Sequence, residues 1–168
     1  MYVAMDEKET NFDNLNEIYR RIREIFSNVK LQKEIPIDEL VQLYSKDETF
    51  FKDLNYIVES LTEITNILAP IDSLENEFLN FLSIKRMIDY LLKDIKLFIV
   101  YLFFIDDLLM NFFNLIHQKL QKADKDYQNE YDLFVSYLND KKEFFYTEIY
   151  KYSGEFEKTV IEINNLLW

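Results

Sequence analysis

A chain of 168 residues is long enough for one domain with a hydrophobic core, and nothing in its composition indicates a second domain. The absence of cysteine excludes disulfides and thiolate metal sites, and one glycine with two prolines leaves too few turn residues for a multi-stranded sheet. The net charge of −12 disfavours direct binding to nucleic acid and permits attraction to a basic protein surface. Residues 1–80 hold most of this charge, with 17 acids against 8 bases.

The first half of the chain has the apolar spacing of three amphipathic helices. Apolar residues at three- and four-residue steps predict the first helix at about residues 11–33, after a flexible segment at residues 1–10. Pro36 suits the first turn of a short second helix, residues 37–44. A third helix is expected at about residues 48–68.

The second half predicts a long antiparallel αα-hairpin, because it lacks proline and has a single glycine, Gly154. Its arms are expected at about residues 73–122 and 126–167, and one register pairs apolar residues such as Phe113 with Phe134 along both arms. A competing layout breaks the last segment at Asn139-Asp140 or at Ser153-Gly154 and gives shorter helices. The predicted fold class is therefore all-α, an elongated bundle of residues 1–168 in which the shorter N-terminal helices pack on this hairpin.

Two adjacent aspartates, Asp106 and Asp107, interrupt the apolar run from Leu97 to Ile116. Placing two aspartates in lipid has a high free-energy cost, so we do not expect a membrane span. Membrane association is only a weaker alternative. The part before them has no polar face, which predicts enclosure by neighbouring helices or by another subunit. In the hairpin register, Asp106 falls opposite Lys141, with Lys142 beside it. We predict that Asp106 and Asp107 form a charged layer with these two lysines and that this layer fixes the register. The alternative is that both aspartates point into water.

The first helix contains three of the four arginines of the chain. Arg20 and Arg23 are candidates for contact with a phosphate or an acidic partner. The alternative interpretation is intrahelical pairing at four-residue spacing, of Glu17 with Arg21 and of Glu24 with Arg20.

The last aromatic-rich segment, KKEFFYTEIYKYSGEF, has more aromatic residues than one helix seam requires. Phe144, Tyr146 and Tyr150 fall outside the seam and form a candidate partner surface, since tyrosine is enriched at interfaces. Core packing against the N-terminal helices is the alternative.

No pattern of catalytic or metal-binding residues is found. The one histidine, His117, lacks the Glu-x-x-His context of a helical di-iron site, and no nucleophile triad or phosphate loop can be assembled. We therefore expect neither an enzyme nor a cofactor or metal site.

The sequence favours a cytoplasmic, non-enzymatic helical module that docks on a basic partner protein, including the case in which it mimics nucleic acid or inhibits a nucleic-acid-binding protein. The alternative is a structural protein that self-associates into a homo-oligomer. The abundance of Phe, Tyr, Ile, Asn and Lys reflects an AT-rich genome and does not bear on function.

Overall fold

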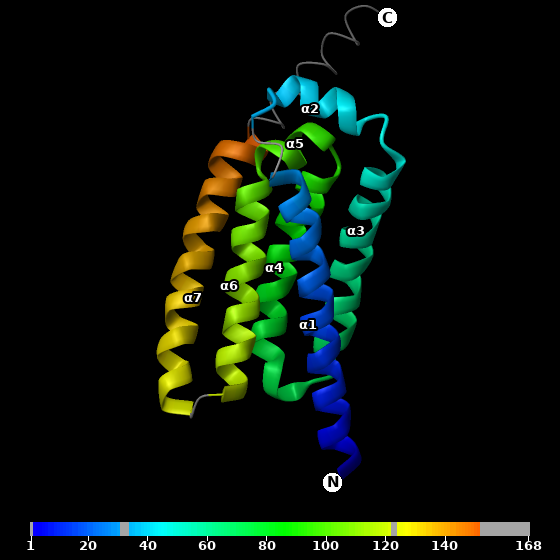
Figure 1. The fold of residues 1–168 in the computed structure, drawn as a ribbon. Coiled ribbons are helices and arrows are strands. Elements are labelled where there is room, and N and C mark those ends of the chain that lie inside the picture. Colours follow the sequence, from blue (N-terminus) through cyan, green and yellow to red (C-terminus); the bar gives the residue numbers. More distant parts are fainter. Residues whose placement is uncertain (1, 31–33, 122–123, 152–168) are drawn as a thin grey trace, which may run out of the picture. The chain divides into compact units, whose positions relative to one another are not determined.

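The computed structural model describes residues 2–30, 34–121 and 124–151, with side chains described for residues 13–29, 34–121 and 126–151. Within these ranges the secondary structure consists of seven α-helices, one short 3₁₀-helix and one π-helix, and it contains no strand (Figure 1). The predicted all-α class is confirmed. The chain divides into two compact units, Met1–Leu120 and Gln121–Trp168, which are described in turn.

The first three helices of unit 1 are α1 (Tyr2–Lys30), α2 (Ile37–Tyr44) and α3 (Glu48–Leu68). The bounds of α2 and α3 agree with the prediction, whereas α1 begins nine residues earlier than expected, within the segment predicted to be flexible. The Asp47 side chain caps α3 by accepting hydrogen bonds from the backbone N–H groups of Thr49 and Phe50. The buried stripe of α1 consists of Leu15, Ile18, Ile22, Ile25, Phe26 and Val29.

The prediction of one continuous helix at residues 73–122 is wrong. After a 3₁₀ turn, η1 (Asp72–Leu74), the structure has three helices: α4 (Glu75–Leu92), α5 (Ile95–Val100) and α6 (Leu102–Gln121). The expected end of this segment near residue 122 is confirmed.

The two interruptions have different causes. Asp94 adopts an extended backbone with φ −134° and ψ 126°, and its Oδ1 accepts a hydrogen bond from the Lys96 N–H at 2.7 Å. The extended backbone of Asp94 thus separates α4 from α5, and its side chain caps α5. The second interruption, at Tyr101, is only a kink, because the Tyr101 N–H still donates to the Leu97 carbonyl at 3.0 Å.

The segment folds back on itself, so that α4 and α6 form an antiparallel pair within unit 1 (Figure 1). At one end of this pair, the Lys119 Nζ of α6 lies 3.0 Å from the Glu77 Oε1 of α4. One turn further along α4, the Phe81 ring packs against Phe112 of α6 with centroids 4.9 Å apart. The first arm of the predicted hairpin is therefore itself a helical hairpin.

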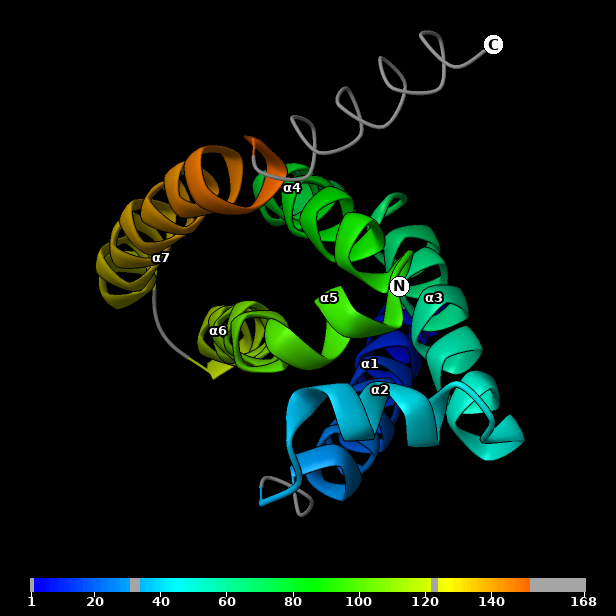
Figure 2. The same cartoon turned by 90° about the horizontal axis from the view of Figure 1, so that it is seen from above.

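The opposite end of unit 1 is closed by an aromatic cluster beneath α2, which crosses that end (Figure 2). Phe98 of α5 is fully buried, and its ring centroid lies 6.3 Å from Phe26 of α1 and 5.9 Å from Phe50 of α3. Tyr44 of α2 stacks on Phe50 at 4.2 Å. The break at Asp94 thereby places Phe98 where it joins helices that are distant in sequence.

The apolar part of the run that precedes Asp106 is only partly enclosed. Phe98, Leu102 and Ile105 are buried as expected, but Val100 and Phe103 are 39% and 56% exposed. The described helices therefore do not cover these two positions, and cover by another subunit stays a prediction.

Unit 2 contains α7 (Asp124–Phe144), which continues into the π-helix η2 (Phe145–Tyr150). No break occurs at Asn139-Asp140, so this alternative is wrong, while Ser153-Gly154 lies outside the described residues. The apolar spacing predicted for this helix is confirmed as a buried stripe of Tyr127, Phe134, Leu138, Phe145 and Ile149. The pairing of this segment with residues 73–122 stays a prediction.

Candidate functional site

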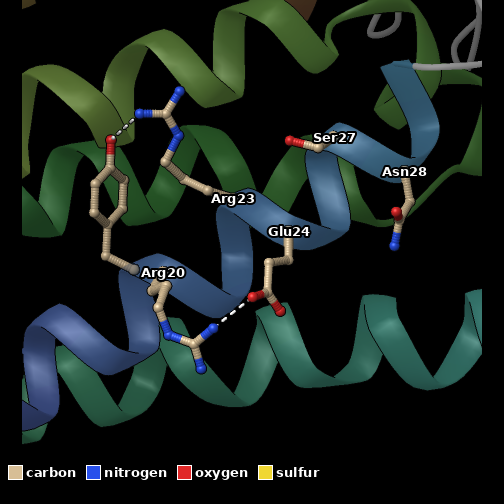
Figure 3. Close-up of a pocket in the computed structure, with 6 residues that line it drawn as sticks. Arg20, Arg23, Glu24, Ser27 and Asn28 are labelled. Carbon is tan, nitrogen blue, oxygen red and sulfur yellow. Dashed lines mark hydrogen bonds and ion pairs between the residues drawn. The ribbon is translucent and has the colours of Figure 1, made fainter.

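Arg20 lies between two carboxylates of α1. Its Nε donates to Glu17 Oε2 at 3.2 Å, and its Nη1 forms a short ion pair with Glu24 (Figure 3). The hydrogen bond from Arg20 holds the pKa of Glu17 below its usual value, and the same hydrogen bond raises the pKa of Arg20. Because both acids already neutralise this guanidinium, Arg20 is poorly suited to a further anion.

Arg23 has an aromatic environment instead. Its Nη1 donates a long hydrogen bond to the Tyr19 hydroxyl at 3.5 Å, and its guanidinium lies 5.7 Å from the centroid of that ring. The Tyr19 ring in turn stacks on Phe113 of α6 at 4.3 Å. Burial raises the pKa of the Tyr19 hydroxyl, and the negative charge of Asp106 acts in the same direction.

A shallow, open hollow of about 490 Å³ is lined by residues of α1 around these arginines, including Ser27 and Asn28. Figure 3 shows the guanidinium groups of Arg20 and Arg23 pointing in different directions, each toward its own partner. The structure therefore does not bring the two groups together, and anion binding by either stays a prediction.

Arg21 packs on α3 rather than on an acid of its own helix. Its guanidinium carbon lies 4.2 Å from the ring centroid of Tyr56, which fits a cation–π contact. The nearby Asp53 is half-buried, and this burial raises the pKa of its carboxyl despite the opposing effect of Arg21. Arg21 thus helps to join α1 and α3.

The residues of the predicted charged layer belong to different units. Asp106 is buried, with 8% of its surface exposed, and Asp107 is half-buried, so the interpretation that both point into water is wrong for Asp106. Lys141 and Lys142 lie in the last turn of α7 and are half-buried, and the Lys141 Nζ lies 5.5 Å from the Tyr137 ring centroid. The layer itself stays a prediction.

The candidate partner surface of unit 2 lies at the end of α7 and on η2. Phe144, Tyr146 and Tyr150 are 45%, 44% and 50% exposed. Tyr146 and Tyr150 contact each other edge to face at 6.0 Å, and each also packs on the buried Phe145 ring. Exposed aromatic rings ordered in this way fit a protein contact, and their role stays a prediction.

The most strongly charged segment of unit 1 was not singled out from the sequence. Residues 34–75, which include α2, α3, η1 and the first residue of α4, contain ten acids and two lysines, a net charge of −8. Asp53 is half-buried and the other nine acids are exposed, and we call these nine the acidic face. They are Glu34, Asp38, Glu39, Asp47, Glu48, Glu59, Glu63, Asp72 and Glu75. Counting charge by predicted helix, rather than over residues 1–80 together, would have found this surface.

Few cations balance the acidic face. Asp38 lies 3.9 Å from the Nζ of Lys96, and both side chains are largely solvated. Among the side chains that the structure describes, none of the other eight acids takes part in an ion pair. Two apolar side chains of α3, Phe51 and Val58, are 41% and 42% exposed beside these acids. Exposed apolar side chains next to polar ones are typical of a protein–protein interface.

The described residues contain no group of three or more histidine, cysteine or acidic side chains that could hold a metal ion. His117 is half-buried on α6. In the same part of the chain, no helix combines the length and the apolar composition needed to cross a membrane.

The fold and these surfaces define an all-α helical bundle protein with an acidic face. In comparisons with known proteins, no protein family matches this sequence, and neither a curated protein nor a solved structure matches it. Functional inference therefore rests on the residues of the chain itself.

Proposed function

We propose that this protein is a binding module whose acidic face docks on the basic surface of a partner protein. The observation that carries the proposal is the net charge of −8 on residues 34–75, with nine acidic side chains exposed. Carboxylates left unneutralised on one surface attract a positively charged partner over about a Debye length, which is about 10 Å at 0.1 M salt.

The rigidity of α3 supports this role. Its N-terminus is capped by Asp47, and its buried side is held by Leu61, Ile64 and Leu68, which are fully buried. The exposed side chains Glu59 and Glu63 are therefore presented on a fixed helix at one-turn spacing. A helix that is already ordered loses little backbone freedom on binding.

The proposal includes a partner that ordinarily binds nucleic acid, because exposed carboxylates resemble phosphate groups in charge. In that case the module would occupy the nucleic-acid site and act as an inhibitor.

The test is capture of partners from an extract of the native host on immobilised protein. We compare the wild type with Glu59→Lys/Glu63→Lys and with a control, Asp140→Lys/Glu143→Lys, which changes the net charge equally at exposed positions of α7. We expect a basic protein that the wild type and the control retain and that Glu59→Lys/Glu63→Lys binds at least tenfold more weakly.

Salt provides an independent readout. Raising the salt from about 0.1 M to about 1 M shortens the Debye length from about 10 Å to about 3 Å, so the captured protein should elute. Capture that neither the charge reversal nor the salt weakens would refute the proposal.

A further inference from the structure

In the part of the chain that the structure describes, Arg23 of α1 has one open edge of its guanidinium group. Its Nη1 donates the long hydrogen bond to the Tyr19 hydroxyl, so the edge formed by Nε and Nη2 takes no part in that contact. Among the described side chains, no carboxylate forms an ion pair with Arg23. The open edge has two parallel N–H donors, which is the geometry that binds two oxygens of a carboxylate or a phosphoryl group.

Tyr19 orients this guanidinium group. The Tyr19 ring is half-buried and stacks on Phe113 of α6, so the ring itself is held in place. The Arg23 guanidinium lies 5.7 Å from the centroid of that ring and donates to its hydroxyl. A side chain that is already oriented loses less conformational freedom when it binds a ligand.

Ser27 adds a third donor next to this edge. It follows Arg23 by four residues, so the two side chains lie on neighbouring turns of the same side of α1. Both are exposed, and both line the hollow of about 490 Å³ (Figure 3). A serine hydroxyl can donate one hydrogen bond to an oxygen in that hollow.

We propose that Arg23 and Ser27 form a binding site for a phosphoryl group, either of inorganic phosphate or of a small phosphate monoester. The Arg23 edge donates to two oxygens, and the Ser27 hydroxyl donates to a third. A carboxylate has two oxygens, so it occupies the Arg23 edge and leaves no separate oxygen for Ser27. Because the hollow is shallow and open, the fourth oxygen of the phosphoryl group faces solvent, and it can carry an ester substituent.

Negative charges near the site limit its affinity. Glu24 also lines the hollow, but Arg20 is already paired with it. Burial raises the pKa of the Tyr19 hydroxyl, and the charge of Asp106 adds to this effect, so an anion bound at Arg23 is also repelled by Asp106. The net charge of −12 opposes any anion at long range. We therefore expect weak binding, with a Kd of about 1 mM.

The test is a titration of the full chain with inorganic phosphate, methyl phosphate and acetate, followed by NMR of the arginine Nε–H groups. Sodium chloride keeps the ionic strength constant, so that screening does not change during the titration. We expect phosphate and methyl phosphate to shift the Arg23 signal saturably, with similar Kd values of about 1 mM. Acetate should bind about fivefold more weakly, since it lacks the hydrogen bond from Ser27.

Two variants separate the parts of the site. Arg23→Lys keeps the positive charge but removes the edge with two donors, so phosphate should bind at least about tenfold more weakly. Its binding is followed through the backbone N–H signals of α1. Ser27→Ala should weaken phosphate about fivefold and leave acetate unchanged. Arg86→Lys, the same exchange at an exposed position of α4, is the control and should bind phosphate like the wild type.

Circular dichroism first establishes that each variant keeps its helix content, which the exposure of these side chains favours. The site is overturned if the wild type shows no saturable shift up to about 50 mM phosphate, or if Arg23→Lys binds phosphate as tightly as the wild type. Acetate that binds as tightly as phosphate would overturn the assignment to a phosphoryl group.

The phosphoryl site does not rest on the proposed function, because its residues belong to α1 and the acidic face does not include α1. Capture of the basic partner by Arg23→Lys should therefore equal capture by the wild type. If Arg23→Lys keeps the partner while the wild type fails to bind phosphate, the proposed function stands and the phosphoryl site fails.

Discussion

The ion pair between Glu77 and Lys119 gives a direct test of the observed α4–α6 hairpin. Glu77 is 1% exposed, whereas the Lys119 side chain is 31% exposed, and the two charged groups lie 3.0 Å apart. Removing the lysine takes a cation away from a buried carboxylate. Removing the carboxylate leaves a lysine that can turn toward water.

This difference in exposure between Glu77 and Lys119 sets the expected losses in the free energy of unfolding. Breaking a fully buried pair costs about 3–5 kcal/mol, and the partial exposure of Lys119 reduces this to about 2–3 kcal/mol for Lys119→Met. Glu77→Gln keeps the shape and one acceptor oxygen for Lys119, so we expect about 1 kcal/mol. For a chain of this size, 2–3 kcal/mol corresponds to a Tm lower by about 5–10 °C.

The assay is urea and thermal unfolding followed by circular dichroism. The double variant Glu77→Leu/Lys119→Met should recover most of the loss, since an apolar pair can replace a buried ion pair at little cost. The reasoning is refuted if Lys119→Met costs less than about 0.5 kcal/mol, or if Glu77→Gln costs more than Lys119→Met.

Three further predictions concern the core and the α1 surface. Phe98→Ala empties a fully buried site and should lower the free energy of unfolding by about 3–5 kcal/mol in urea titrations, whereas Phe103→Ala, which is 56% exposed, should cost far less. Asp94→Ala removes the cap that accepts the Lys96 N–H and should cost about 1 kcal/mol in the same assay. Because the folded state holds the Tyr19 proton more tightly, the stability linked to Tyr19 is complete below about pH 10 and is lost as the pH rises above it. Tyr19→Phe should therefore reduce the fall in Tm between about pH 9 and 11; an unchanged fall would contradict this cause.

The ends of α2 and α3 could be predicted because local chemistry marks them. Pro36 precedes α2, and Asp47 and Pro70 lie just outside the two ends of α3. Proline cannot continue a helix and aspartate caps one, and neither effect depends on the rest of the fold.

The break between α4 and α5 could not be predicted from periodicity. Leu91, Ile95, Phe98 and Leu102 keep helical spacing across it, so the apolar pattern is the same as in a continuous helix. The one local signal is Asp94, which caps α5. The break places Phe98 in the aromatic cluster, and this tertiary contact is not visible in the local pattern.

The arginine contacts were predicted only where they stay within α1. The pair of Glu24 with Arg20 was expected from its four-residue spacing and is present. Glu17 was expected to pair with Arg21 and instead pairs with Arg20. Arg21 lies over Tyr56 of α3, so the partner of Arg21 depends on how α1 packs against α3.

The charge of residues 1–80 was recognised in the sequence, but its concentration in residues 34–75 was not. Which acids reach solvent together depends on the sides of α2 and α3 that are buried. Burial of Leu54, Ile57 and Leu61 turns Glu59 and Glu63 outward.

The most direct test of the proposed function is the affinity of the captured basic protein, measured by calorimetry in about 0.1 M salt. Glu59→Lys/Glu63→Lys should bind it at least tenfold more weakly than the wild type, while Asp140→Lys/Glu143→Lys, with the same net charge, should lose much less. Equal losses in the two variants would show that only the overall charge matters, and would contradict a docking site on the acidic face.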